Sequence, residues 1–162
     1  MTLRVLGIDP GTAVTGFGVV ESAEDRTSQL IDCGVIRTDV RQPLCHRLDT
    51  LYEGVTELIH RYRPDAIALE GVFYAKNVRT TVVLGHARGV ILLAAARADV
   101  ELAEFSPATV KKSIVGTGRA AKSQVSYMVQ RLLQLRSPPQ PDDAADGVAL
   151  ALTYLIRERV PA

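Results

Sequence analysis

Acidic residues stand at three separate points of the chain where a predicted secondary-structure element begins or ends. The residues are Asp9 after the apolar run 3–8, Glu70 after the run 66–69, and Asp142, Asp143 and Asp146 at the start of an apolar, helix-like stretch. Carboxylates that meet at one point repel one another, so such a group normally holds hard divalent cations. The pattern predicts a Mg²⁺-dependent enzyme that acts on phosphates.

The elements that must position these acids follow from the periodicity of the apolar residues. Strands are expected at 3–8, 16–22, 29–38, 66–69 and 101–105, and helices at 44–62, 79–98, 122–135 and 142–158, with a short helix opening at Pro107. Three early strands followed by alternating helices and strands are typical of an α/β protein with a mixed five-stranded sheet and helices on both faces. Asp9 and Glu70 would then lie at the carboxyl ends of strands, where such sheets usually bind ligands.

The acids of the last predicted helix leave one choice open. Asp143 and Asp146 are three residues apart and Asp142 and Asp146 are four apart, so either pair would share a helix face. Gly147 lies inside this predicted helix, where a glycine costs about 1 kcal/mol of helix propensity relative to Ala. A glycine at this point would allow the backbone or a substrate to approach closely. In the simplest alternative, Asp142 or Asp143 only caps the helix and Asp9 only makes a turn.

Composition limits the class of protein. With 162 residues, 47% of them hydrophobic, the chain is expected to form a single domain, residues 1–162, with a solid core. Cys33 and Cys45 lack metal-type spacing and are too few for a disulfide framework, which favours a reducing, cytoplasmic compartment. The N-terminus has no signal-peptide pattern. The longest apolar run, 90–96, is far shorter than the ~20 residues of a membrane span, so no membrane is expected.

Charge is segregated along the chain although the net charge is only +1. Residues 71–98 and 105–136 contain Lys and Arg and no acid. A basic flank of this kind would bind a phosphate backbone that the acidic centre processes. Two ordinary solvent-exposed faces would give the same pattern. Charge distribution alone therefore does not distinguish a nucleic-acid-binding surface from such faces.

An ordered series of short motifs covers nearly the whole chain. The motifs are Ile-Asp-Pro-Gly at 8–11 with Thr-Gly-Phe-Gly at 15–18, Leu-Glu-Gly-Val-Phe-Tyr-Ala-Lys-Asn at 69–77, Leu-Gly-His-Ala-Arg-Gly at 84–89, Val-Lys at 110–111, Val-Gly-Thr-Gly at 115–118, Ala-Lys-Ser-Gln-Val at 121–125 and Asp-Ala-Ala-Asp at 143–146. Each motif alone is weak, but their joint order and spacing closely resemble the RuvC family of Holliday-junction resolvases.

The resemblance implies a ribonuclease-H-like fold and a homodimer that makes paired, metal-dependent cuts in a four-way DNA junction. It implies four catalytic, metal-binding acids, Asp9, Glu70, Asp143 and Asp146, and so favours Asp143 over Asp142. Two Mg²⁺ ions per site, or Mn²⁺ in their place, would yield ligatable 5′-phosphate and 3′-hydroxyl ends during recombination and repair. A branch-migration helicase complex is the implied partner. Gly71 departs from the family pattern, in which a longer polar residue is expected.

Junction-DNA roles are implied for Phe73, Lys111 and Lys122. Phe73 and Tyr74 are expected to stack on an unpaired base, although packing of their loop on the core is the alternative. Lys76, Asn77 and Arg79 are further candidates for DNA contacts. The two lysines would contact phosphates, and one of them would stabilise charge at the scissile phosphate.

Helix 79–98 is apolar around most of its circumference. It is expected to be a buried core helix, a two-fold dimer seam, or both, with Gly85 and Gly89 allowing two backbones to approach. His86 is interpreted as a helix residue beside this interface and not as a ligand.

Three other functions compete with a junction endonuclease. An actin-like ATPase or kinase also carries an Asp-x-Gly-Thr loop, here at 9–12, but it needs a longer chain and a second such loop, which the sequence lacks. A non-catalytic DNA-binding module would not need all four acids. A ribonuclease H-type or single-strand nuclease would share the carboxylates. Nucleotide hydrolysis, or binding without Mg²⁺-dependent cutting, would distinguish the first two.

Overall fold

The protein is built on one five-stranded sheet with the strand order β3-β2-β1-β4-β5. The computed structural model describes residues 1–25, 27–71 and 77–158. The strands are β1 (Leu3–Asp9), β2 (Val14–Ser22), β3 (Ser28–Arg37), β4 (Ala66–Glu70) and β5 (Glu101–Phe105). The first three form an antiparallel meander, whereas β4 pairs in parallel with both β1 and β5. The predicted mixed five-stranded sheet is therefore confirmed.

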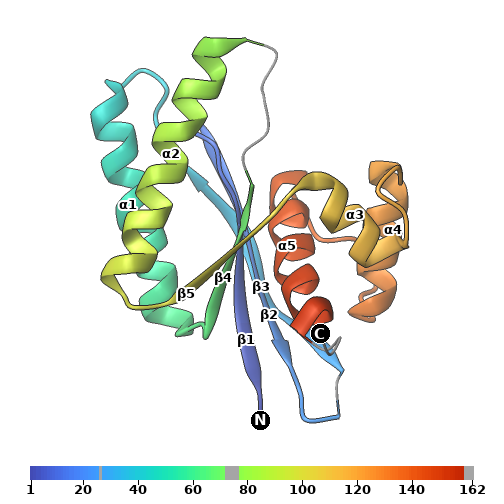
Figure 1. Cartoon of the computed structure of the whole chain (residues 1–162). Helices are drawn as coiled ribbons and strands as arrows, with labels where there is room; N and C mark the ends of the chain where they lie inside the picture. Colours follow the sequence, from blue (N-terminus) through green and yellow to red (C-terminus); the bar gives the residue numbers. More distant parts are fainter. Residues whose placement is uncertain (26, 72–76, 159–162) are drawn as a thin grey trace.

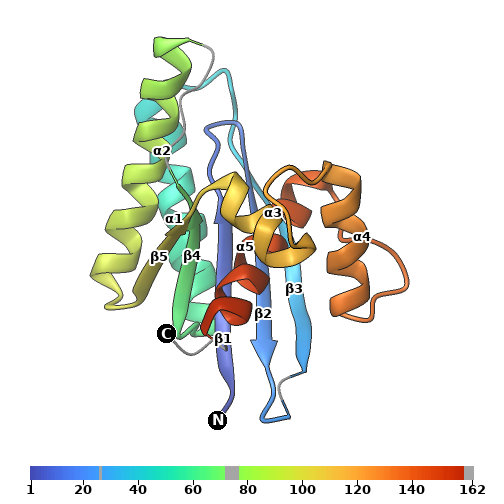
Figure 2. The same cartoon turned by 45° about the vertical axis from the view of Figure 1, so that its right-hand side comes forward.

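Helices cover both faces of this sheet (Figure 1). The helices are α1 (Leu44–Tyr62), α2 (Val78–Arg97), α3 (Pro107–Val115), α4 (Lys122–Leu132) and α5 (Asp142–Glu158). The first two lie on one face, and α5 lies on the other with α3 and α4 outside it (Figures 1 and 2). Helix α4 ends three residues before the predicted end, because Gln134 adopts a left-handed conformation with a φ of 53°.

Two hydrophobic clusters, one on each face, follow the alternation of side chains along the central strands. On β1, Leu6 and Ile8 belong to the cluster under α1 and α2, whereas Val5 belongs to the cluster under α5. Strand β4 alternates in the same way, with Leu69 on the α1–α2 side and Ala68 on the α5 side. Residues in phase with Val5 and Ala68 therefore face α5.

Helix α5 packs directly on β2 with almost no side chain between the two backbones. A Cβ atom built on Gly16 would lie 1.7 Å from the main-chain oxygen of Asp143, and one on Gly147 would lie 2.7 Å from main-chain atoms of Phe17. Only glycine permits this approach. The close approach expected at Gly147 is thus one of backbone to backbone, and it fixes where the first turns of α5 lie.

Helix α2 is less buried than its composition suggests. Only Ala87, Ile91, Ala94 and Ala95 are buried, all on one face. Among the described residues, α2 is the one helix long and apolar enough to cross a membrane by length and composition, and 22% of that stretch is buried. A fully buried core helix is therefore the wrong interpretation of this segment, whose outer face leaves apolar side chains exposed.

Candidate metal centre

Asp9 and Glu70 lie side by side because β1 and β4 are parallel neighbours. Ile8 pairs with Leu69, so the next residue on each strand reaches the same edge of the sheet. Strand alternation then turns both carboxyl groups toward α5. The two groups share a hydrogen bond. Sequence position and strand pairing together are sufficient to make this contact.

Helix α5 brings two further carboxylates to the same point. Each of Asp9, Asp143 and Asp146 offers an oxygen atom, and these atoms all lie within 4.8 Å of one another. Glu70 joins these three through its hydrogen bond with Asp9. The four predicted acids, Asp9, Glu70, Asp143 and Asp146, therefore form one group, here called the acidic cluster. Asp142 is exposed at the start of α5 and is not among the three. The structure thus places Asp143, and not Asp142, beside Asp9.

The acidic cluster is electrostatically strained in the absence of cations. Burial, followed by the charge of Glu70, raises the pKa of Asp9 to about 8, and Asp146 and Asp143 add to the effect. Burial also raises the pKa of Glu70 and of Asp146, although Lys122 opposes the rise at both. Since like charges at close range cannot all ionise, Asp9 retains a proton near neutral pH that a cation would displace.

The donor set fits hard divalent cations such as Mg²⁺ or Mn²⁺. All the candidate ligand atoms are carboxylate oxygens, and no soft ligand accompanies them in the group. A divalent ion would remove the repulsion that raises the pKa of Asp9. The N-terminal dipole of α5, near Asp143, offsets only a small part of that charge.

Two lysines border the acidic cluster on the side of α3 and α4. The Nζ atom of Lys122 lies 3.4 Å from Oδ2 of Asp146, and the charge of Asp146 raises the pKa of the lysine. Lys111 on α3 is half-buried and lines the same hollow as Lys122, Glu70 and Asp146. Both lysines therefore lie where a phosphate bound at the carboxylates would meet them.

Hollows adjoin the acidic cluster on both sides of Glu70. Toward α3 and α4 lies a cavity of about 220 Å³ that contains the two lysines, here called the lysine cleft. Toward α2 lies a smaller cavity of about 60 Å³, lined in part by Gly71 and Arg88. The larger hollow, on the side of the two lysines, therefore offers most of the open space beside the acidic cluster.

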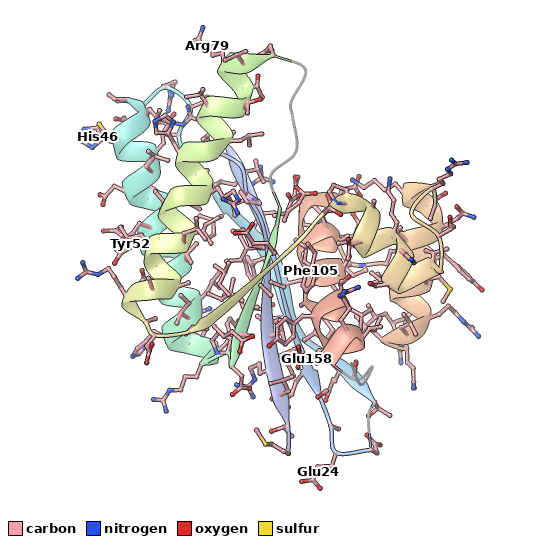
Figure 3. The ribbon with its side chains drawn as sticks, viewed as in Figure 1. Glu24, His46, Tyr52, Arg79, Phe105 and Glu158 are labelled. Carbon is pink, nitrogen blue, oxygen red and sulfur yellow. The ribbon has the colours of Figure 1, made fainter. Side chains whose placement is uncertain are left out.

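The remaining predicted DNA contacts are placed only in part. Phe73, Tyr74 and Lys76 lie outside the described residues. The side chain of Asn77 accepts a hydrogen bond of 2.8 Å from the Thr80 amide and so caps α2. Arg79 is exposed at the start of α2, far from the sheet (Figure 3). Asn77 thus has a structural role whether or not it contacts DNA.

One charged residue beside the acidic cluster is not singled out by the sequence. Arg88 forms an ion pair with Glu104 of β5 and lines the smaller cavity with Glu70. Its Nε atom is buried and has no hydrogen-bond partner among the described residues. Arg88 falls in the acid-free stretch 71–98 and in the Leu-Gly-His-Ala-Arg-Gly motif at 84–89, and neither signal separates it from its neighbours.

Comparison with known proteins agrees with this geometry. The family model described as "Crossover junction endodeoxyribonuclease RuvC" matches residues 5–154. Proteins of that name from Rubrobacter xylanophilus and Moorella thermoacetica are 50% and 48% identical, over 98% and 94% of this chain and 88% and 90% of their own.

A solved structure matches this chain over nearly its whole length. The RuvC of T. thermophilus in complex with a Holliday junction substrate has a TM-score of 0.92 and 35% identity, covering 97% of this chain and 95% of its own. The yeast mitochondrial resolvase Ydc2, at 16% identity and a TM-score of 0.67, shares the fold. The fold is therefore ribonuclease-H-like, and the chain belongs to the RuvC family of crossover junction endodeoxyribonucleases.

Proposed function

We propose that this protein resolves four-way DNA junctions by metal-dependent hydrolysis of phosphodiester bonds in two opposed strands. The observation that carries the proposal is the acidic cluster, in which Asp9, Asp143 and Asp146 converge with Glu70 and are bordered by lysines on one side. A phosphate beside bound cations would satisfy both the carboxylates and the lysines. Membership of the RuvC family makes junction DNA the expected substrate.

The four carboxylates would hold two Mg²⁺ ions, or Mn²⁺ in their place, which supply an activated water and stabilise the leaving oxygen. The water oxygen would bond to the scissile phosphorus as the bond from phosphorus to the 3′ oxygen breaks. The water would give up one proton to the solvent and the departing 3′ oxygen would take one up, so the products are a 3′-hydroxyl and a 5′-phosphate that a ligase can seal. Lys122 and Lys111 bind the phosphate oxygens and offset their charge as it builds.

We propose a homodimer seamed along α2. Three exposed apolar side chains, Val78, Val82 and Leu93, fall on one stripe with the exposed glycines Gly85 and Gly89. A Cβ atom on either glycine would meet nothing within 4 Å in the described part of this chain, so the space is open to a partner. A two-fold dimer matches the approximate two-fold symmetry of a four-way junction and offers one site to each opposed strand.

The flanking contacts and the cellular setting belong to the same proposal. Phe73 and Tyr74 would stack on unpaired bases at the crossover, while Lys76, Asn77 and Arg79 contact the backbone. The protein would act in the cytoplasm, in recombination and DNA repair, together with a branch-migration helicase complex.

The direct test is cleavage of a mobile four-way junction with and without Mg²⁺, with the cut positions mapped on all strands. We expect paired, symmetric nicks in opposed strands that DNA ligase reseals, and no cutting in EDTA. Glu70→Gln provides the inactive control. Junction binding without cutting in any divalent cation, or hydrolysis of ATP in place of DNA, would refute the proposal.

A further inference from the structure

Helix α4 exposes apolar and basic side chains together on one face. Tyr127 and Leu132 are 59% and 40% exposed, and Arg131 is exposed as well. Met128 is half-buried beside them. Tyr127 and Arg131 are four residues apart, and so are Met128 and Leu132, so the four side chains form one continuous patch on the helix. This patch is here called the outer α4 face.

The outer α4 face lies opposite the side of the helix that borders the lysine cleft. Val125 lines that cleft, and Val129 and Leu133 belong to or pack into the buried core, which fixes the position of α4. Tyr127 is two residues from both Val125 and Val129, and two residues correspond to about 200° around a helix. Helix α4 is also an outer element on its side of the sheet (Figures 1 and 2). A DNA strand at the acidic cluster therefore does not account for this face.

The composition of the outer α4 face is typical of a protein–protein interface. Single exposed apolar side chains are ordinary on a protein surface, but here they adjoin one another and an arginine. Tyr, Met and Arg are enriched in interfaces, where Lys, Asp and Glu are depleted, and Tyr and Arg often carry much of the binding energy. A phosphate backbone is bound by charged and polar groups, so it would leave Met128 and Leu132 uncovered.

The charge around this face is basic. Arg131 lies within it, and the exposed Arg119 and Arg136 stand three residues before the start and four residues after the end of α4. Residues 105–136 contain no acid. A partner with complementary charge would therefore carry acidic side chains.

We propose that the outer α4 face docks a partner protein through an acidic, amphipathic helix. The apolar stripe of that helix would cover Tyr127, Met128 and Leu132, because rows of side chains spaced four residues apart pack against similar rows on a second helix. Its Asp or Glu residues would pair with Arg131 and the two flanking arginines. Docking here would leave the acidic cluster open to DNA, and it would not require the proposed nuclease activity.

Two synthetic peptides, each about five helical turns long, test the proposal. One carries leucines at helical spacing flanked by glutamates, and the other is identical except that lysine replaces every glutamate. Calorimetry should show binding of the acidic peptide only, and shifts of backbone amide NMR signals should concentrate at residues 127–132. Tyr127→Ala and Arg131→Glu should each weaken binding of the acidic peptide about tenfold or more. Both variants should bind and cut a junction as wild type does.

Controls separate the possible outcomes. Arg61→Glu makes the same change of net charge at an exposed residue of α1, and it should bind the acidic peptide as wild type does. The inactive Glu70→Gln should also bind it, and circular dichroism checks that each variant is folded. Equal binding of the two peptides by wild-type protein, or no binding of either, would overturn the proposal without any variant. A loss of junction affinity in Arg131→Glu that Arg61→Glu does not share would assign the face to a DNA arm and would overturn protein docking.

Discussion

Asp9→Asn should make the metal-free protein more stable while it abolishes cleavage. The pKa of Asp9 is raised to about 8 from an ordinary value of 3.8, chiefly by burial and by Glu70. Between these two values the folded protein holds a proton that the unfolded chain releases. The free energy of unfolding therefore falls as pH rises from about 4 to about 8, and above pH 8 the penalty is fully present.

The magnitude follows from the size of that shift. At pH 7 the linkage penalty is at most about 4 kcal/mol, because each pKa unit is worth about 1.36 kcal/mol. Part of this penalty arises from the interaction of Asp9 with Glu70, whose own protonation can change to reduce it. We therefore expect Asp9→Asn to raise the free energy of unfolding by about 1–3 kcal/mol. In a chain of this length that gain corresponds to about 2–10 °C in Tm. The asparagine keeps the side-chain shape and its amide can donate a hydrogen bond to Glu70.

The assay is thermal unfolding in EDTA at several pH values between 5 and 8, followed by titration with Mg²⁺. The gain in Tm for Asp9→Asn over wild type should grow with pH, and Mg²⁺ should stabilise wild type more than the variant. Asp142→Asn, an exposed acid on the same side of the molecule, should show neither effect. A variant less stable than wild type at pH 8 in EDTA would refute the assignment of the acidic cluster as a strained, cation-holding group.

Other consequences concern cutting, assembly and the crossover. Glu70→Gln and Asp146→Asn should bind a junction at least as tightly as wild type and yet fail to cut it, in paired gel-shift and cleavage assays, and near-normal cutting would contradict the two-metal site. Gly89→Leu should shift the protein toward monomer in sedimentation or destabilise it, because a Cβ atom at this position meets nothing within 4 Å in the described part of its own chain but would face a partner across the seam. Any fall in Tm that comes from lost dimerisation should depend on protein concentration. A wild-type protein that is monomeric on junction DNA at micromolar concentration would argue against the seam. Phe73→Ala should slow single-turnover cleavage about tenfold or more with little change in Tm, as expected for a base contact of ~1–3 kcal/mol, whereas a large fall in Tm with unchanged cleavage would assign that ring to packing.

The sequence by itself determined the central strands and the positions of two acids. Short apolar runs that stop at Asp9 and Glu70 specify strands because burial on both faces leaves no polar position to break them. Once β1 and β4 are parallel neighbours, the two acids must share an edge. The order of the motifs was enough to indicate the family, since it depends on spacing along the chain and not on packing.

Tertiary structure alone decided which face of α5 reaches the acidic cluster and which face of α2 stays exposed. Spacing allowed Asp142 or Asp143 to join Asp146, and the contact of Gly16 with the backbone at Asp143 sets the position of α5 on the sheet. Composition gave α2 apolar residues around its circumference, and only its packing leaves Val82 and Leu93 exposed. The pKa of Asp9 and the lysine cleft likewise depend on groups that are distant in sequence. Local propensity specifies elements, but burial and charge interactions arise only between them, so they cannot be read from any one segment.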